Sequence, residues 1–329
     1  MEASEVLLIV ALGMALIFAF LNGFHDSASI VAPAIASRAM TPRQALLWTA
    51  LGEFAGPFVL GVAVAQVIAS GLVQPAAISL TALVAALGGA VAWGLLTWWW
   101  GLPSSSSHAL VGGLVGAALA AAGPSGVQWK GLGWVLLALL ISPPLGFVAG
   151  FGLARVIFFL ARAAPPSINR GFRGGQWLTT VSLALGHGAN DGQKSMGLMA
   201  LALLLAGREK ELRVLPPMIW AAAAAIALGA SVGGWRLIRT VGGRILRVRP
   251  VHGFVSQLGS ALVIVAAAWS GAPVSTTQVI NSAIMGAGAA DRWSKVRWGV
   301  ARDMGVAWLL TIPVSAALAA GWYLLLRAL

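Results

Sequence analysis

Apolar runs of about twenty residues recur along the whole chain, and they limit the possible folds more than any other feature of the sequence. An α-helix of that length and composition can cross a lipid bilayer. Hydrophobic residues make up 59% of the 329 residues and charged residues only 9%, whereas soluble proteins contain about 25% charged residues. The sequence therefore predicts an all-α polytopic membrane protein and excludes a soluble globular one.

The surplus of basic residues, which gives a net charge of +12, lies mainly in short connections between the apolar runs. Cytoplasmic loops of membrane proteins are enriched in Lys and Arg in this way, so the charge predicts no nucleic-acid partner. The basic connections at residues 38–43, 155–173, 236–249 and 292–297 all fall inside if both termini lie outside. The first apolar run lacks the basic leader of a cleaved signal peptide and is expected to remain as a span. We therefore predict a multi-pass protein of the cell membrane (the inner membrane in a cell with two).

The two halves of the chain repeat the same motifs in the same order. FLNGFHDSAS around Asp26 matches LGHGANDGQKS around Asp191, and GLPSSSSHALVGGLVG matches GAPVSTTQVINSAIMG further along each half. We predict a first transmembrane repeat at residues 1–162, a cytoplasmic linker at 163–175, and a second repeat at 176–329. The charge distribution requires an odd number of crossings in each half, so the two repeats are expected to have inverted topology. Such repeats are typical of secondary transporters, whose substrate site lies near the midplane.

The two hydroxyl-rich segments interrupt apolar stretches that lie too close together for ordinary loops. Each is predicted to be the tip of a discontinuous or re-entrant helix, with Pro103 or Pro273 in the first helical position. A helix N-terminus offers N–H donors and a partial positive charge to an anion. Two such tips, brought together, predict a cage for a small tetrahedral oxyanion. Simple helix capping and close helix packing, for which Gly112 and Gly116 are suited, is the alternative.

Three acidic residues lie well inside apolar segments: Asp26, Glu53 and Asp191. Ionisable groups inside a membrane are costly and usually mark the path of an ion or a substrate. Glycines beside Asp26 and Asp191 are expected to weaken the helix and free backbone carbonyls, which together with a carboxylate suit Na⁺. Proton carriage by the carboxylates is the alternative, and Glu53 has either a structural or a coupling role. A cation beside the anion would offset its desolvation and make the two bindings mutually dependent, which is the basis of symport.

Histidine and lysine residues also stand beside these motifs. The spacing of His25, His108 and His187 does not match a transition-metal site, so we expect hydrogen-bonded structural histidines. The chain has no cysteine, which excludes disulfides and thiolate metal sites. Lys194 lies one helical turn after Asp191, and it is expected either to pair with that acid or to contact the anion.

These motifs resemble those of the PiT family of inorganic phosphate transporters. The matching segments cover nearly the whole chain in order, and the most specific parts read HGANDGQK and PVSTT. The resemblance implies cation-coupled uptake of phosphate by a homodimer whose fold consists of two inverted repeats. It implies cation sites at Asp26 and Asp191, with Asn22 or Asn190 beside them. It also implies that phosphate contacts six hydroxyl residues: Ser105, Ser106, Ser107, Ser275, Thr276 and Thr277.

Two positions depart from the family pattern. Ser29 stands where Asn is usual, which alters a candidate cation ligand, and Gln278 stands where His is common. Relatives resembling this family also carry sulfate, so a sulfate permease is an alternative function. Asp26 or Asp191 can accept a hydrogen bond from the protonated oxygen of HPO₄²⁻, and this favours phosphate as the substrate.

Two further classes of function fit the sequence less well. A passive anion channel would conduct without depending on a cation, whereas the buried acids predict the opposite. An intramembrane aspartyl hydrolase is disfavoured because neither Asp26 nor Asp191 lies in a GxGD motif. We therefore predict that the chain is not an enzyme and needs no cofactor other than Na⁺ or H⁺ as the coupling ion.

Overall fold

The structure, a computed structural model, describes residues 3–328, and the described chain is helical throughout, with no β-strand. The first half contains α1 (Ala3–Ala36), α2 (Pro42–Leu60), α3 (Ala63–Gly71), α4 (Leu80–Trp100), α5 (Ser106–Ala122) and α6 (Trp129–Leu160). The second half contains α7 (Ile168–Leu205), α8 (Pro216–Val232), α9 (Trp235–Arg239), α10 (Pro250–Ser270), α11 (Thr276–Asp291) and α12 (Trp298–Ala328). The prediction of an all-α protein is confirmed.

Six of these helices, α1, α4, α5, α6, α10 and α12, are long and apolar enough to cross a membrane. Two further pairs qualify if each is counted as one bent span: α2 with α3, which meet at 82°, and α8 with the segment Trp235–Arg244, which meet at 58°. Apolar side chains cover the outside, and Leu309 and Trp269 are among the most exposed. A bundle with this surface needs a lipid environment, so the polytopic class is confirmed.

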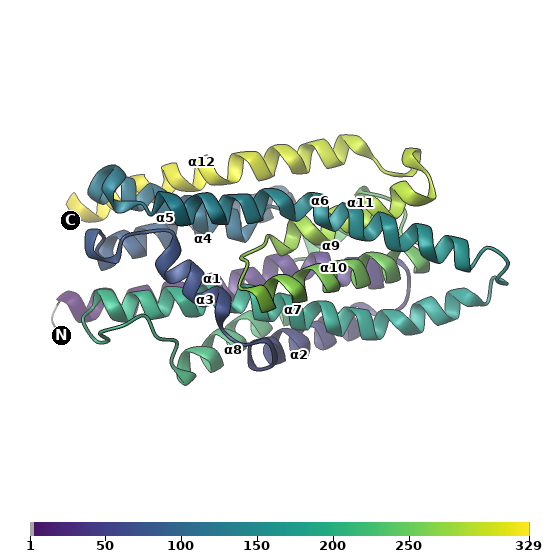
Figure 1. The fold of residues 1–329 in the computed structure, drawn as a ribbon, viewed down its shortest axis with the longest axis horizontal. Helices are drawn as coiled ribbons and strands as arrows, with labels where there is room; N and C mark the ends of the chain where they lie inside the picture. The colour runs from purple at the N-terminus through teal and green to yellow at the C-terminus, as the bar shows by residue number, and fades with distance from the viewer. Residues whose placement is uncertain (1–2, 329) are drawn as a thin grey trace.

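The order of elements is the same in both halves. Each half has a long helix, a bent pair, a span, a short break, a half-length helix and a final long helix. In Figure 1, α5 and α11 run from the middle of the molecule toward opposite ends, which is the arrangement that inverted repeats predict. Both termini lie at one end, and the turn between α6 and α7 lies at the other. Because α7 begins at Ile168, the predicted linker at 163–175 is helical from residue 168 onward.

The two halves exchange helices. The half-length helix α5 packs along α12, and α11 packs along α6, so each pair joins one half to the other. Glycines make this packing close: a Cβ atom at Gly116 would collide with the backbone of Ala316, and one at Gly146 with the backbone of Val279. Small residues at helix crossings allow backbones to approach in this way. The packing role predicted for Gly116 is confirmed.

The two hydroxyl-rich breaks are built from the same capping residues. α4 ends at Gly101 and α10 at Gly271, both with a positive φ (68° and 71°) that glycine adopts without strain. α5 and α11 then begin after the N-caps Ser105 and Ser275, whose hydroxyls accept from backbone amides three residues later. The discontinuous helices predicted from the sequence are therefore present in both halves.

The position predicted for the two prolines was wrong. Pro103 and Pro273 lie before the N-caps, in the extended connections, and not in the first turn of α5 or α11. The helices begin later because the serine hydroxyl, which can accept the first free amide, comes two residues after each proline.

The prediction that glycines weaken the helices around the two aspartates was also wrong. α1 and α7 are continuous through Asp26 and Asp191. A Cβ atom at Gly23 would collide with the backbone of Ile226 on α8, and one at Gly188 with the backbone of Glu53 on α2. These glycines serve close helix packing, which keeps the helical hydrogen bonds of both long helices intact.

Candidate substrate and cation site

The tips of α5 and α11 meet in the interior of the molecule. Ser275 Oγ donates a hydrogen bond of 2.7 Å to Ser105 Oγ, and Ser107 Oγ donates to the carbonyl of Val274 at 3.1 Å. Of the six hydroxyl residues singled out in the sequence, five are at most 4% exposed, and Ser106 is half-buried. The two hydroxyl segments therefore lie against each other and away from lipid.

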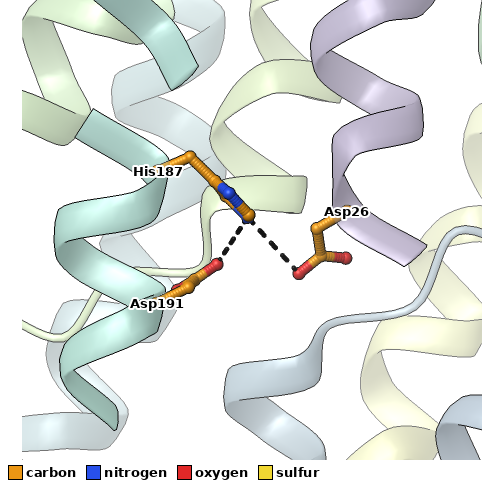
Figure 2. A group of neighbouring side chains, drawn as sticks. All are labelled: Asp26, His187 and Asp191. Atoms are coloured by element: carbon orange, nitrogen blue, oxygen red, sulfur yellow. Dashed lines mark ion pairs between the residues drawn. The ribbon is translucent and has the colours of Figure 1, made fainter. Parts of the chain in front are cut away.

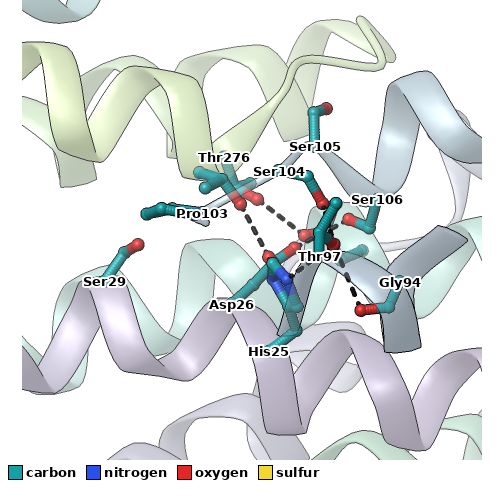
Figure 3. A network of polar contacts seen from close by, with 12 residues as sticks. His25, Asp26, Ser29, Gly94, Thr97, Pro103, Ser104, Ser105, Ser106 and Thr276 are labelled. Carbon is teal, nitrogen blue, oxygen red and sulfur yellow. Dashed lines mark hydrogen bonds and ion pairs between the residues drawn. The ribbon is translucent and has the colours of Figure 1, made fainter. Parts of the chain in front are cut away.

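The tip of α11 donates hydrogen bonds to both buried aspartates. The tip of α5 contacts Asp26 and Lys194, which is the partner of Asp191. Ser106 Oγ and Thr277 Oγ1 each donate a hydrogen bond of 2.7 Å to Asp26, and Thr276 Oγ1 donates one of 2.7 Å to Asp191. Figure 3 shows Ser106 and Thr276 approaching this region from opposite sides of Asp26. His25 Nδ1 completes the shell of Asp26 at 3.0 Å. The acid and hydroxyl motifs of both halves thus form one site.

Lys194 lies inside the same cluster and is fully buried. Its ammonium group pairs with Asp191, donates a hydrogen bond of 2.6 Å to Ser107 Oγ, and lies 3.3 Å from the carbonyl of Val274. The expected pairing with Asp191 is confirmed. A buried ammonium group is tolerated only with such partners, so Lys194 fixes the tip of α5 against α7.

His187 connects the three acids. Its Nε2 atom lies 2.8 Å from Asp191 and 4.0 Å from Asp26, and its Nδ1 atom lies 2.9 Å from Glu53. Figure 2 shows the imidazole between the two aspartates. One ligand atom from each of Asp26, His187 and Asp191 lies within 4.8 Å of the other two, a spacing that can hold a metal ion. This central place was missed in the sequence, although His187 stands four residues before Asp191, on the same helix face.

The other two histidines match the structural role expected for them. His108 Nδ1 lies 2.7 Å from Ser105 Oγ, and His25 contacts Asp26 and lies 3.5 Å from Thr97 Oγ1. Figure 3 shows His25 between Asp26 and Thr97. Both rings orient hydroxyl or carboxylate groups of the site.

Several predicted residues keep polar atoms without a hydrogen-bond partner within residues 3–328. Asn190 donates to the carbonyl of Ala272 at 3.2 Å, but its Oδ1 atom has no partner. The Oε2 atom of Glu53 and the Nδ2 atom of Asn22 also make no hydrogen bond, whereas Oε1 of Glu53 faces His187. Buried polar atoms are normally satisfied, so Oδ1 of Asn190 and Oε2 of Glu53 are available to a ligand that approaches His187 or Asp191.

The two positions that depart from the family pattern lie at the edge of the cluster. Ser29 Oγ accepts from Asn281 Nδ2 at 3.4 Å, so it contacts α11 and not the carboxylates. The Oε1 atom of Gln278 is buried and has no hydrogen-bond partner within the described residues. Ser29 is therefore already engaged in a contact between the halves.

A small cavity of about 20 Å³ adjoins the cluster between α1, α4 and the start of α5. Its polar wall consists of Asn22, His25, Ser104 and Ser106, and Trp98 forms part of its apolar wall. A cavity of this volume accommodates about one water molecule. Water can therefore stand directly beside Ser106, whose hydroxyl contacts Asp26.

Gln193 is a further residue that the sequence did not single out. Its Oε1 atom accepts from the backbone amides of Val64 at 2.7 Å and Ala65 at 3.3 Å, at the first residues of α3. The chain turns by 82° between α2 and α3, so the amides of the first turn of α3 lack the partners that a continuous helix would supply. The helix that carries Asp191 therefore also caps the second part of the bent span.

Comparisons with known proteins agree with the resemblance seen in the sequence. The model of the phosphate transporter family (PHO4) matches residues 22–319. A probable low-affinity inorganic phosphate transporter of Rhizobium meliloti (strain 1021) is 41% identical over 96% of each chain. A protein of the same description from Bacillus subtilis (strain 168) is 39% identical over 99% of each chain.

A solved structure has the same fold. It is described as the sodium-dependent phosphate transporter and superimposes with a TM-score of 0.88 at 26% identity, covering 98% of this chain and 100% of the other. The family consists of transporters, so the prediction that the chain is not an enzyme is confirmed. The fold, the buried cluster and these similarities lead to one conclusion: the chain belongs to the phosphate transporter family.

Proposed function

We propose that the protein is a symporter that moves inorganic phosphate across the cell membrane together with a cation. The contact between hydroxyls and carboxylates carries this proposal. Ser106, Thr276 and Thr277, which would bind phosphate, donate their hydroxyl hydrogens to Asp26 and Asp191, which would bind the cation. A hydroxyl has one hydrogen, so it cannot donate to a carboxylate and to phosphate at once.

This competition supplies a mechanism of coupling. A cation that binds Asp26 or Asp191 neutralises the negative charge of the carboxylate, and the hydroxyls are then free to donate elsewhere. The released hydroxyls, with the free amides at the tips of α5 and α11, then donate to phosphate. The bound cation lowers the free-energy cost of burying phosphate, and bound phosphate lowers the cost of burying the cation. Each ligand therefore raises the affinity for the other by the same factor. Ser105, Ser107 and Ser275 complete the set of donors around the anion.

The charge of the cluster supports the need for a cation. The carboxylates of Asp26, Glu53 and Asp191 outnumber the single ammonium group of Lys194, which leaves two negative charges when His187 is neutral. A phosphate dianion placed in this buried cluster would meet strong repulsion. In that protonation state a bound cation is needed to offset the repulsion.

Na⁺ is the cation that we propose, and H⁺ is the alternative. The cluster offers carboxylate oxygens from Asp26 and Asp191, the amide oxygen of Asn190 and Oε2 of Glu53, with Asn22 nearby on α1. Oxygen ligands of this kind suit a hard cation. The solved structure with the same fold is described as sodium-dependent, which also supports Na⁺.

Uptake of radiolabelled phosphate into proteoliposomes tests the proposal. Gradients of Na⁺ and H⁺ are imposed separately, with the membrane potential clamped, and sulfate is added as a competitor. We expect a Na⁺ gradient to drive accumulation of phosphate, and sulfate to compete poorly. Uptake that ignores both gradients would refute coupling, and uptake that follows the H⁺ gradient alone would replace Na⁺ by H⁺.

The orientation and the homodimer belong to the same proposal. Both termini are expected outside, with the turn between α6 and α7 inside, because the basic connections then face the cytoplasm. The chain has no cysteine, so single cysteines at Ala164 and Ser125 can be labelled without background. An impermeant thiol reagent added to intact cells should label Ser125→Cys and spare Ala164→Cys, and the opposite pattern would invert the orientation. Mass photometry of the detergent-purified protein checks the dimer.

A further inference from the structure

A cavity of about 480 Å³ lies beside the start of α7, and Figure 1 shows this start next to the turn between α6 and α7. One wall is the turn before α7 and the first turns of that helix, with Ser167, Asn169, Arg170 and Arg173. The other wall is the start of α10, with Arg249 next to Pro250. Three arginines and no acidic residue line this cavity.

Buried contacts hold the two walls together. Gln176, which is fully buried, donates from Nε2 to the carbonyl of Pro250 at 3.1 Å. One turn earlier on α7, the ring of Phe172 packs on Phe254 of α10 at a centroid distance of 5.7 Å. Basic loops on the cytoplasmic face of membrane proteins gather charge without forming a shaped cavity. Here the arginines are carried by two helix starts whose spacing is fixed.

The positive charge of the cavity is largely uncompensated. The side chains of Arg170 and Arg173 make no hydrogen bond or ion pair within the described residues 3–328, and both are exposed. Arg249 lies 3.4 Å from Asp291, but that carboxylate is also 2.5 Å from Lys295 and 3.1 Å from His252. One acid shared among several basic groups cannot neutralise the cavity.

The cavity is distinct from the site between the helix tips. α7 is continuous from Ile168 to Leu205, and at a rise of about 1.5 Å per residue the backbone of Arg173 lies about 27 Å from that of Asp191. An anion bound here therefore neither contacts the hydroxyls of α5 and α11 nor depends on the transport function proposed above.

We infer that this cavity is a second anion site, which binds a phosphate group through Arg170, Arg173 and Arg249. Guanidinium groups donate two parallel hydrogen bonds to phosphate oxygens, and three arginines line a cavity large enough for a substituted phosphate. Two sources supply this chemistry at a membrane surface: the headgroup of an anionic phospholipid and free inorganic phosphate. Leu160, the last residue of α6, and Leu178, on α7, are 71% and 72% exposed. Lipid therefore surrounds these helices, which favours the headgroup.

The test uses the full-length protein purified in detergent and a matched pair of variants. Arg170→Gln/Arg173→Gln removes two charges from the cavity. Arg292→Gln/Arg302→Gln removes two exposed charges at the same end of the molecule but outside the cavity. Thermal unfolding is followed by tryptophan fluorescence while dioleoyl phosphatidylglycerol, dioleoyl phosphatidylcholine or inorganic phosphate is titrated. The number of phosphate ions bound per chain is measured with radiolabelled phosphate at equilibrium.

We expect phosphatidylglycerol to raise the unfolding midpoint of the wild type and of the Arg292→Gln/Arg302→Gln variant. Its apparent affinity for the Arg170→Gln/Arg173→Gln variant should be lower by roughly fivefold for each arginine, or roughly 25-fold in total. Phosphatidylcholine, which has no net charge, should not distinguish the variants. The loss should shrink as salt is raised, because these arginines are exposed.

The alternative source gives a different pattern. If free phosphate is the occupant, the wild type binds one more phosphate ion per chain than the Arg170→Gln/Arg173→Gln variant, and phosphatidylglycerol affects both alike. If neither phosphatidylglycerol nor phosphate distinguishes this variant from the Arg292→Gln/Arg302→Gln control, the cavity holds no phosphate group and the inference is overturned. Equal unfolding midpoints of the two variants without ligand show that both are folded.

Discussion

Thr277 on α11 donates a hydrogen bond of 2.7 Å to Asp26 on α1, although the two residues belong to different halves of the chain. Asp26 also accepts from Ser106 of its own half at 2.7 Å. Each aspartate therefore accepts a hydrogen bond from a hydroxyl at a helix tip, and Asp26 accepts one from both tips. A movement of either tip changes the hydrogen bonding of a carboxylate, which links the position of the helices to the occupancy of the site.

Removing the charge of Asp191 should abolish cation-driven uptake. Asp191→Asn keeps an oxygen for the hydrogen bond from Thr276 but leaves the buried ammonium group of Lys194 without its counter-charge. Breaking a buried ion pair on one side costs about 3–5 kcal/mol, so we also expect a lower unfolding midpoint. Uptake in proteoliposomes and thermal unfolding measure the two effects. Asp303→Asn, an exposed acid on α12, is the control; normal Na⁺-driven uptake in Asp191→Asn would remove this residue from the cation site.

The hydroxyl group of Thr277 should contribute more to phosphate affinity than the volume of its side chain does. Thr277→Val removes the donor to Asp26 at nearly constant volume, whereas Thr277→Ser keeps it. A hydrogen bond to a charged group contributes about 1.5–3 kcal/mol, so phosphate affinity in the Val variant should fall roughly ten- to hundredfold.

The matched control is Thr49→Val, because the hydroxyl of Thr49 is buried and has no hydrogen-bond partner within residues 3–328. Equilibrium binding of radiolabelled phosphate gives the affinities. If Thr277→Val and Thr49→Val bind phosphate equally well, the hydroxyl of Thr277 does not act on the anion.

A methyl group at Gly188 should force α2 away from α7. Its Cβ atom would collide with the backbone of Glu53, which cannot yield as a flexible side chain does. Overpacking of this kind costs about 1–3 kcal/mol, and the shift would also separate Glu53 from His187. We expect Gly188→Ala to lower the unfolding midpoint and to change the Na⁺ dependence of uptake.

Gly171→Ala provides the comparison for this variant. Gly171 lies on the same helix, and its added Cβ atom would meet nothing within 4 Å. Alanine is favoured over glycine in a helix by up to about 1 kcal/mol, so this variant should be as stable as the wild type or more so. Equal loss of stability in both variants would contradict the packing argument.

The carboxyl group of Asp291, at the end of α11, should make stability depend on pH in acid. Partial burial raises its pKa, but the hydrogen bond from Lys295 and the neighbouring basic groups outweigh burial and hold the pKa below its usual value. A group with a lowered pKa in the folded state stabilises the protein above its unfolded pKa of about 3.9, and this contribution is lost as the pH falls further.

Asp291→Asn should therefore lower the unfolding midpoint at pH 7, and the difference from the wild type should shrink below about pH 4. Thermal unfolding at a series of pH values between roughly 3 and 7 measures this difference in unfolding midpoint. A difference that stays constant over this range would show that the charge of Asp291 contributes nothing to stability.

Much of the fold could be predicted because apolar runs and their interruptions are local features of the sequence. The breaks at Gly101 and Gly271 follow from glycine and hydroxyl residues between two apolar stretches. The start of α5 was predicted three residues too early, since Pro103 is a suitable first residue of a helix. The helix begins after Ser105 because the hydroxyl of that residue accepts from the backbone amide of His108.

The pairing within the site could be predicted only in part. The pair of Lys194 and Asp191 follows from their spacing on one helix. The contact of His187 with Glu53 was not predictable, because Glu53 lies on α2 and reaches the site only through the close approach of α2 to Gly188. The choice of Asp26 as the acceptor for Thr277 also required the structure, since either aspartate lies within reach of a tip whose orientation is unknown.

The exchange of helices between the halves has a consequence for biogenesis. The face of α5 that carries Gly112 and Gly116 packs against α12, which follows all the other described helices along the chain. During synthesis, this glycine-lined face of α5 stays uncovered in the translocon or the surrounding lipid until α12 has been made. A nascent chain that stalls before α12 therefore exposes this face of α5 to quality-control proteases.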